Sequence, residues 1–267
     1  MRMTTGARGT AGVRSSLLLT CVIPAMLLAG DAWAAQPDLY SAVAIVTGKD
    51  NLPERARGIR EALPLVLAKV TADAEVAVRA VSEGLVAEAE ALVVGLNYRD
   101  RKEGIQISDE QGTRDRSFEL TVHFDPEGID AMLSELGAEP WRGERPEIGV
   151  ALVVSDGVAE YLVTRNSDRG YGQRLAIGDE AKALGLPVVL PDDVPEGATV
   201  SEQLARIALD SPVRLQGRME MTPAGYWNTG WQLTAAGIDD RFTFQNTTFD
   251  EAIARALSRS AKRLAKR

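Results

Sequence analysis

The sequence predicts an α+β protein made of two small antiparallel-sheet-plus-helix domains in tandem, which follow a cleavable signal peptide. Three observations predict this class. The N-terminus reads as a secretory leader, strand-like and helix-like periods succeed one another in both halves, and a proline-rich segment separates those halves. The predicted boundaries are 1–34 for the signal peptide, 35–139 for the N-terminal domain and 146–267 for the C-terminal domain.

The leader has the residue order of a secretory signal peptide. Three arginines precede an apolar run at Leu17–Ala29, and Ala32-Trp33-Ala34 supplies the small residues of a cleavage site. The run is shorter than the roughly 20 residues that cross a bilayer as a helix, so a retained membrane anchor is the weaker interpretation. A lipoprotein cleaved before Cys21 is weaker still, because Gly, Ala or Ser would be expected before the cysteine. We therefore expect export to the periplasm.

Cleavage after Ala34 removes the only cysteine and leaves 27 basic and 37 acidic residues, a formal net charge of −10. The mature chain can therefore form no internal disulfide, and its acidity argues against nucleic-acid binding. It also contains no apolar run long enough for a transmembrane segment. The C-terminus is the exception to the acidic balance, because its last residues include a basic group: Arg255, Arg259, Lys262, Arg263, Lys266 and Arg267.

The N-terminal half begins with a strand at Leu39–Val46, and Pro53 then suits the first turn of a helix. Apolar residues recur along that helix at three- and four-residue spacing, and a second helix is predicted from about Glu75 to Val94. The strict alternation of Phe118–Phe124 predicts a strand with one buried face. Pro126 opens a short helix after it.

Residues 138–146 hold two prolines and a glycine around a tryptophan, which predicts the domain junction; an ordinary loop inside one domain is the alternative. A central strand follows at Ile148–Val154, because its apolar run shows little alternation. Further on, three strands in meander order and a final helix capped by Thr248 complete the half. The remaining predicted elements are helices near 173–184 and 200–209 and a short strand at 188–190.

Catalytic constellations are difficult to find in this chain. Its single histidine, His123, and the lack of a mature cysteine exclude Cys–His pairing, the HExxH zinc motif and any multi-histidine or thiolate metal site. The scattered glycines form no phosphate-binding loop. We therefore predict no catalytic residue, no metal and no cofactor. We interpret His123 as a solvated side chain on the solvent-exposed face of its strand.

The densest polar run is Asp109–Arg116, which interleaves both charge signs around a glycine. Its functional interpretation is a loop whose arginines grip a carboxylate or phosphate, with Arg114, Asp115 and Arg116 as candidate binding residues. The favoured alternative is a charged hairpin turn with local ion pairs. Carboxylates such as Asp109, Glu110 and Asp115 also permit a rival hypothesis, a hydrolase or transferase that needs neither histidine nor cysteine.

Two further features have both a binding and a structural interpretation. Trp227 and Trp231 lie four residues apart, on the same face of one strand, and could form a platform for a glycan or a partner, although such tryptophans more often fill a core. The basic C-terminal helix could contact anionic lipid weakly or an acidic partner, although it more often is a solvated face.

The most specific segment for a family resemblance is Asp109–Arg116. The other matching segments are Leu63–Thr71, Tyr98-Arg99, Phe124-Asp125, Pro140-Trp141, Arg145-Pro146, Leu186-Pro187, Leu190-Pro191 and the tryptophan-bearing meander. Through these segments the chain resembles an exported bacterial family of unknown function, domain of unknown function 2066. The resemblance implies export to the bacterial envelope and brings no known activity. The order of elements in the second half is also similar to small periplasmic accessory domains, a likeness of fold alone.

These observations predict a non-enzymatic periplasmic protein that acts as a binding or accessory module and whose partner is an envelope protein or envelope component. The alternatives are the carboxylate-dependent hydrolase or transferase and a peripheral lipid-binding protein.

Overall fold

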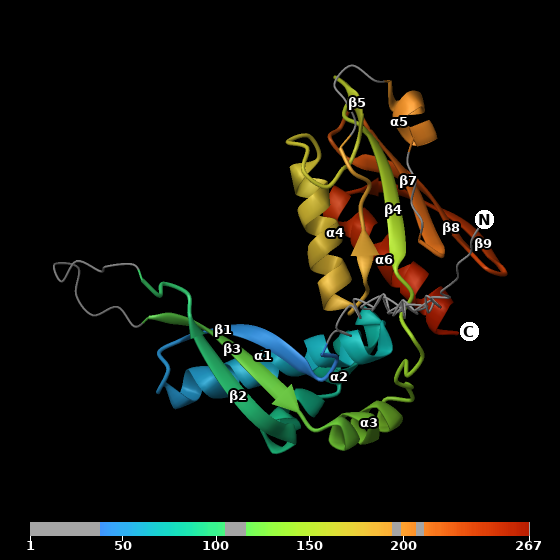
Figure 1. The fold of residues 1–267 in the computed structure, drawn as a ribbon. Coiled ribbons are helices and arrows are strands. Elements are labelled where there is room, and N and C mark those ends of the chain that lie inside the picture. The colour runs from blue at the N-terminus through green and yellow to red at the C-terminus, as the bar shows by residue number, and fades with distance from the viewer. Residues whose placement is uncertain (1–37, 105–115, 194–198, 207–210, 267) are drawn as a thin grey trace, which may run out of the picture. The chain divides into compact units, whose positions relative to one another are not determined.

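The computed structural model describes residues 38–104, 116–193, 199–206 and 211–266, which form an α+β protein (Figure 1). It has two sheets, each with its own buried hydrophobic cluster. The signal peptide predicted at 1–34 lies outside the described residues. The chain from residue 37 onward forms one compact unit, and its division into two domains stays a prediction.

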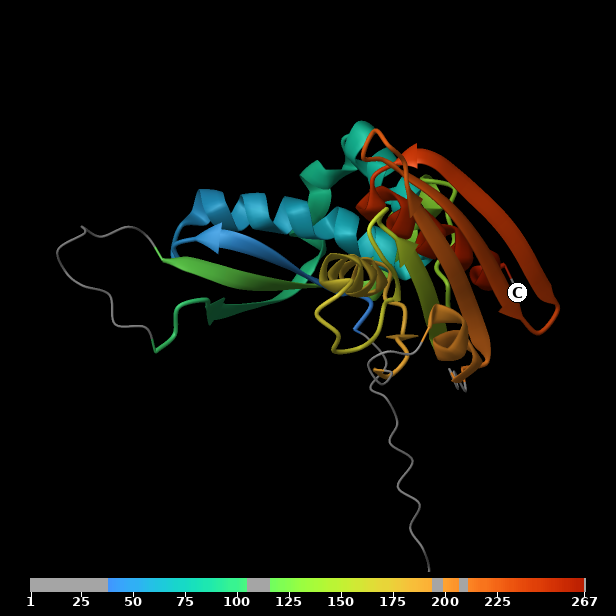
Figure 2. The same ribbon diagram turned by 90° about the horizontal axis from the view of Figure 1, so that it is seen from above.

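Sheet A is antiparallel, with strand order β1-β3-β2, where β1 is Ser41–Thr47, β2 is Val93–Asp100 and β3 is Ser117–Phe124. Alternate side chains of β1 and β3 are buried, because each strand turns every second residue toward the core. Helix α1, Leu52–Thr71, runs along that face (Figure 2), and α3, Pro126–Glu135, follows β3.

Local signals explain where α1 begins and ends. The Asn51 side chain accepts a hydrogen bond from the Glu54 N–H, which satisfies one of the free donors of the first turn. Pro53 lies in that turn, where its missing N–H costs nothing. The helix continues through Pro64 and ends at Ala72, which adopts the left-handed conformation with φ of 54°. Leu63, Val66 and Leu67 are among its fully buried residues.

The single helix predicted from Glu75 to Val94 is wrong in its extent. Helix α2 spans only Ala74–Ser82, and a 3-10 helix, η1, occupies Leu85–Leu92 before β2 begins. Gly84 lies between them with φ of 80°, a conformation that interrupts an α-helix and that glycine adopts at little cost. The alanine- and glutamate-rich composition favoured a continuous helix, but this glycine divides the segment.

Sheet B is mixed, which corrects the purely antiparallel arrangement predicted for the second half. Strand β4, Ile148–Ser155, runs parallel to β7, Val213–Met221, and to the short β6, Val188–Val189. It pairs antiparallel with β5, Glu160–Leu162. The apolar residues from 148 to 154 are all buried, as in parallel strands covered on both faces.

The predicted meander is confirmed as β7-β8-β9, in which β8 is Trp227–Ala235 and β9 is Ile238–Thr247. Helices α4, Tyr171–Ala183, and α6, Phe249–Ala265, pack on one face of the sheet and share its hydrophobic cluster. The short α5, Val200–Arg206, precedes β7 in the chain (Figure 1).

A glycine makes room for a tryptophan in the core of sheet B. Gly217 of β7 lies opposite Trp231 of β8, and the indole packs directly over the glycine backbone. A Cβ atom at position 217 would lie 2.4 Å and 2.5 Å from two indole carbons and 2.9 Å from a Leu152 methyl. The Trp231 Nε1 donates to the Thr229 hydroxyl at 3.0 Å, so its polar atom is satisfied within the core.

The proline-rich segment between the sheets is packed against helix ends. Trp141 and Arg145 are only 9% and 8% exposed, and the guanidinium carbon lies 4.7 Å from the indole centroid. Burial lowers the pKa of Arg145 to about 10. Its two terminal nitrogens donate to carbonyls at the C-terminal ends of α1 and α4, namely those of Lys69, Val70, Leu184 and Gly185. Arg145 therefore caps both helices with one side chain.

Candidate functional site

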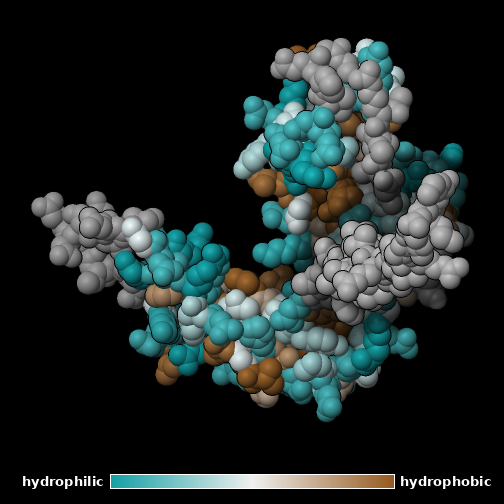
Figure 3. All heavy atoms as spheres, viewed as in Figure 1, coloured by the Kyte–Doolittle hydropathy of each residue, from teal (hydrophilic) through white to brown (hydrophobic). Residues whose placement is uncertain are grey.

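The face of sheet A opposite α1 carries a mixture of apolar and polar side chains. On β1, Val43 and Ile45 are 40% and 42% exposed. Thr121 lies beside Val43 on β3, and Asn97 lies beside Thr121 on β2. Figure 3 shows small hydrophobic patches among hydrophilic residues over these elements. This mixture of apolar surface and hydrogen-bonding groups is typical of a protein interface.

His123 on this face is held between two side chains. Its Nδ1 lies 3.3 Å from Asp38 Oδ2, and its Nε2 lies 3.0 Å from Asn97 Nδ2. Both ring nitrogens therefore face a hydrogen-bonding partner. No local sequence pattern pairs His123 with a carboxylate, and the fold supplies one from Asp38, three residues before β1 begins. Because both ring nitrogens have a partner, the two contacts orient the imidazole.

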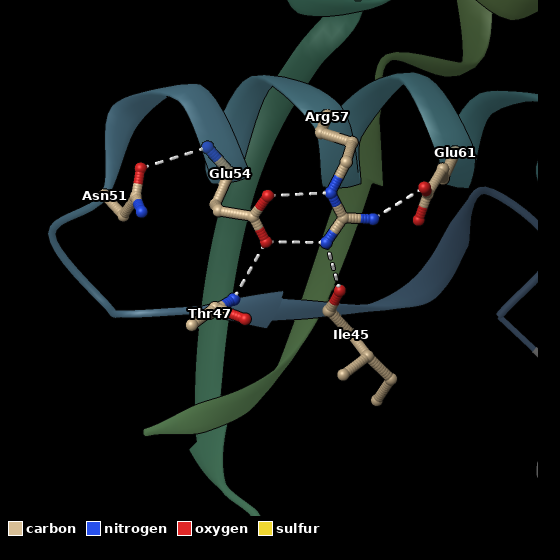
Figure 4. Close-up of polar contacts among 6 residues, drawn as sticks. All are labelled: Ile45, Thr47, Asn51, Glu54, Arg57 and Glu61. Carbon is tan, nitrogen blue, oxygen red and sulfur yellow. Dashed lines mark hydrogen bonds and ion pairs between the residues drawn. The ribbon is translucent and has the colours of Figure 1, made fainter. Parts of the chain in front are cut away.

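The outer edge of β1 is closed by side chains of α1 (Figure 4). Arg57 Nη2 donates to the Ile45 carbonyl at 2.7 Å, and the Thr47 N–H donates to Glu54 Oε2 at 3.1 Å. Arg57 also bonds both carboxylate oxygens of Glu54, at 2.9 Å and 2.7 Å, and Glu61 at 2.6 Å. The Arg57 guanidinium and the Thr47 N–H lower the pKa of Glu54 to about 2, so its charge persists in acid.

The other end of the same edge is closed by Lys69. Its Nζ donates to the Ser41 carbonyl at 2.6 Å and to the Asp38 carbonyl at 3.3 Å. Burial lowers the pKa of Lys69 from its ordinary value. The sequence predicts a helix with one apolar face here and assigns no role to Arg57, Glu61 or Lys69. Their role in covering a strand edge depends on how α1 packs beside β1, which no local pattern reports.

At the outer edge of β2, the alternation of hydrogen bonds along the strand shows which backbone groups point away from β3. The Arg101 N–H donates to the Ser117 carbonyl at 3.3 Å, which makes these opposite residues a bonded pair. Because bonded pairs alternate in antiparallel sheets, Asn97 and Arg99 also bond toward β3. The backbone groups of Leu96 and Tyr98 therefore point outward, and no other described residue bonds them.

Of the three candidate binding residues in the polar run, the described part of the chain includes Arg116. Arg114 and Asp115 lie outside the described residues, as do Asp109 and Glu110. Arg116 is described, and its Nη1 bonds Asp100 Oδ2 at 2.6 Å across the base of the β2–β3 hairpin. That contact is a local ion pair of the kind expected for a charged hairpin turn.

Trp227 and Trp231 are buried in the protein core, and their candidacy as binding residues stays a prediction. They are 6% and 4% exposed and belong to the hydrophobic cluster of sheet B. Their common strand face is the one that packs on α4 and α6, so the indoles are covered by the protein itself. The core interpretation of these residues accounts for the observed geometry.

A groove of about 680 Å³ lies on the other face of sheet B, over Ala151 and Val153 and beside Gly230. Arg218 lines it, but its guanidinium pairs with Glu160 and Glu220. The charge that would attract an anionic ligand is thus largely neutralised within the protein.

The basic C-terminal helix makes several internal ion pairs. Arg259 bonds Asp240 through two nitrogens, each at 3.0 Å. Lys262 Nζ lies 2.9 Å from Asp73 Oδ1 and 3.2 Å from Glu75 Oε1. These pairs reduce the positive charge available to an anionic membrane, and contact with lipid stays a prediction. In the part of the chain that the structure describes, no helix is long and apolar enough to cross a membrane.

Acidic and histidine side chains do not gather into a metal-binding group: across 38–104, 116–193, 199–206 and 211–266, no three of them are placed to hold an ion.

Comparison with known proteins adds one similarity. Residues 34–142 match a family model described as a domain of unknown function (DUF8605). This match supports an uncharacterised family for the part of the chain that contains sheet A. It does not support the more specific resemblance to domain of unknown function 2066. No curated protein matches the sequence.

Proposed function

We propose that this chain is an exported binding protein, a non-enzymatic accessory module of the bacterial envelope that contacts a protein partner through sheet A. The observation that carries the proposal is the face of sheet A opposite α1. There, Val43 and Ile45 stand exposed beside the oriented His123 and the hydrogen-bonding side chains of β2 and β3. Apolar surface next to fixed polar groups suits recognition of another protein.

Export is supported by two observations that agree on one position. The leader pattern ends at Ala34, and the match to the domain of unknown function begins at residue 34. The proposal predicts that the protein isolated from cells begins at Ala35 and fractionates with the periplasm. A chain that lacks residues 2–34 provides the control and should stay in the cytoplasm. An intact N-terminus on cytoplasmic protein would contradict export.

Binding through sheet A is tested by photo-crosslinking in living cells. A photoreactive amino acid replaces Ile45, which is 42% exposed on the open face, or Leu65, which is 43% exposed on α1. Because the two positions are equally accessible, random collisions label them equally. The proposal predicts a discrete protein adduct at Ile45 that Leu65 does not give. The same adducts from both positions, or none from Ile45, would refute it.

A further inference from the structure

We propose that the free edge of β2 is a strand-addition site, which binds an extended peptide segment of another protein that carries a carboxylate side chain. The inference rests on the proposed function, since it names the site and the chemistry of the partner. In strand addition, main-chain hydrogen bonds supply affinity, and the neighbouring side chains supply specificity.

The two edges of sheet A differ in how far side chains of the described residues cover their backbone groups. At β1, Lys69, Arg57 and Glu54 occupy outward backbone groups of Ser41, Ile45 and Thr47, so an incoming strand would have to displace three charged side chains. Such covering is how proteins prevent unwanted pairing at a sheet edge. Within the described residues, the edge of β2 has no comparable cover. The sheet therefore accepts a new strand at β2 and resists one at β1.

The groups available at β2 define the geometry of the added strand. Leu96 and Tyr98 each present an outward N–H and C=O, and the residues between and beside them already bond β3. A segment of about four residues satisfies both pairs, because bonding residues alternate along a strand. The side chains of Leu96 and Tyr98 are half-buried at the margin of the sheet A cluster, so apolar residues of the segment would extend that cluster.

The position of Arg55 indicates that the added segment carries a negative charge. Its Nε donates to the Tyr98 hydroxyl at 2.9 Å, which places the guanidinium at the end of the Tyr98 side chain. No carboxylate of the described residues lies within ion-pair distance of Arg55. A carboxylate on the added segment therefore suits this position, and arginine is well matched to bind it in a bidentate manner.

A second copy of the chain fits this edge less well than a different protein. Antiparallel pairing of two β2 strands through their outward backbone groups would place Tyr98 of each copy opposite Leu96 of the other. Because each Arg55 bonds its own Tyr98, the two guanidinium groups would come close together on the same face of the extended sheet. Like charges that face each other across paired strands are destabilising. Charge complementarity thus favours an acidic segment.

Photo-crosslinking from Val94 identifies the segment. Val94 of β2 is 67% exposed, and Val78 of α2, at 68%, is the matched control. We expect Val94 alone to give an adduct whose captured peptide, sequenced by mass spectrometry, comes from another protein and contains Asp or Glu. Capture of the chain by itself, or of a segment without an acid, would overturn the inference. An adduct at Ile45 without one at Val94 would overturn it and leave the proposed function standing, whereas no adduct at either would remove both.

The captured segment is then synthesised and titrated against residues 35–267. We expect Arg55→Glu to weaken binding about fivefold or more and Arg55→Lys to retain most of it. Arg60→Glu, five residues further along α1, is the control and should have little effect. Equal binding by the Arg55→Glu variant would overturn the role of the charge.

Amide hydrogen exchange distinguishes strand addition from a side-chain contact. With the peptide bound, exchange at Leu96 and Tyr98 should slow by about tenfold or more, because their outward N–H groups become bonded. Exchange at Asn97 and Arg99, which already bond β3, should change much less. Equal protection of all four amides, or of none, would overturn strand addition.

Discussion

Replacing Arg145 with methionine should lower the free energy of unfolding by about 2–4 kcal/mol. Two guanidinium nitrogens each make charge-assisted hydrogen bonds to helix-end carbonyls, and such bonds contribute about 1.5–3 kcal/mol each. Burial opposes them, since the drop in the Arg145 pKa from 12.5 to about 10 corresponds to a cost of about 3 kcal/mol. Methionine removes both contributions but leaves buried carbonyls without a donor, which adds about 1–3 kcal/mol.

Urea unfolding of residues 35–267, followed by tryptophan fluorescence, measures this loss. Arg142→Met is the control, because Arg142 lies in the same segment but is 69% exposed and pairs only with Asp130. An exposed ion pair contributes about 1 kcal/mol or less, so this variant should stay close to the wild type. If Arg145→Met unfolded within about 0.5 kcal/mol of the wild type, the assignment of Arg145 as a cap of two helices would be refuted.

Two more predictions concern packing and pH. Gly217→Ala should cost about 1–3 kcal/mol in urea unfolding because its Cβ would overlap the Trp231 indole, whereas Gly230→Ala, whose Cβ meets nothing within 4 Å, should not. Glu54→Gln should be less stable than the wild type at pH 6. Because the Glu54 pKa is about 2 when folded and 4.5 ordinarily, its contribution is full above pH 4.5 and lost toward pH 2, where thermal melts of both proteins should converge. A difference unchanged at pH 2 would contradict the ion pair with Arg57.

The periodicity of apolar residues predicted the elements that have one buried and one solvent-exposed face. Phe118–Phe124 alternates strictly, and the observed β3 differs from it by one residue. The capping residue Thr248 and the apolar stripe of the last helix likewise located α6. What periodicity could not provide was the direction of β4. Its residues are apolar on both faces, so the sequence indicates a central strand. The same pattern does not indicate which strand lies beside it or whether the two run parallel or antiparallel.

The candidate site was less accessible to sequence reasoning because its residues meet only through the fold. Asp38 and His123 come from opposite ends of the N-terminal half, and β3 must lie beside β1 before they meet. Glu54 and Arg57 have the spacing of an ordinary helix-surface pair, and only the packing of α1 turns them toward the β1 backbone. The open edge of β2 is a property of strand order, which local patterns do not encode.

The parallel pairing of β4 with β7 has a consequence for how the chain folds. Strands β7, β8 and β9 join by short turns and can pair soon after they are synthesised, but β4 must wait until β7 is present. During that interval the run from Ile148 to Val154, apolar and free of charge, has the composition of segments that aggregate. Strand β5, which follows within a few residues, can shield one end of it early. We therefore expect slow folding to expose this segment first, and chaperones that bind extended apolar peptides to recognise it there.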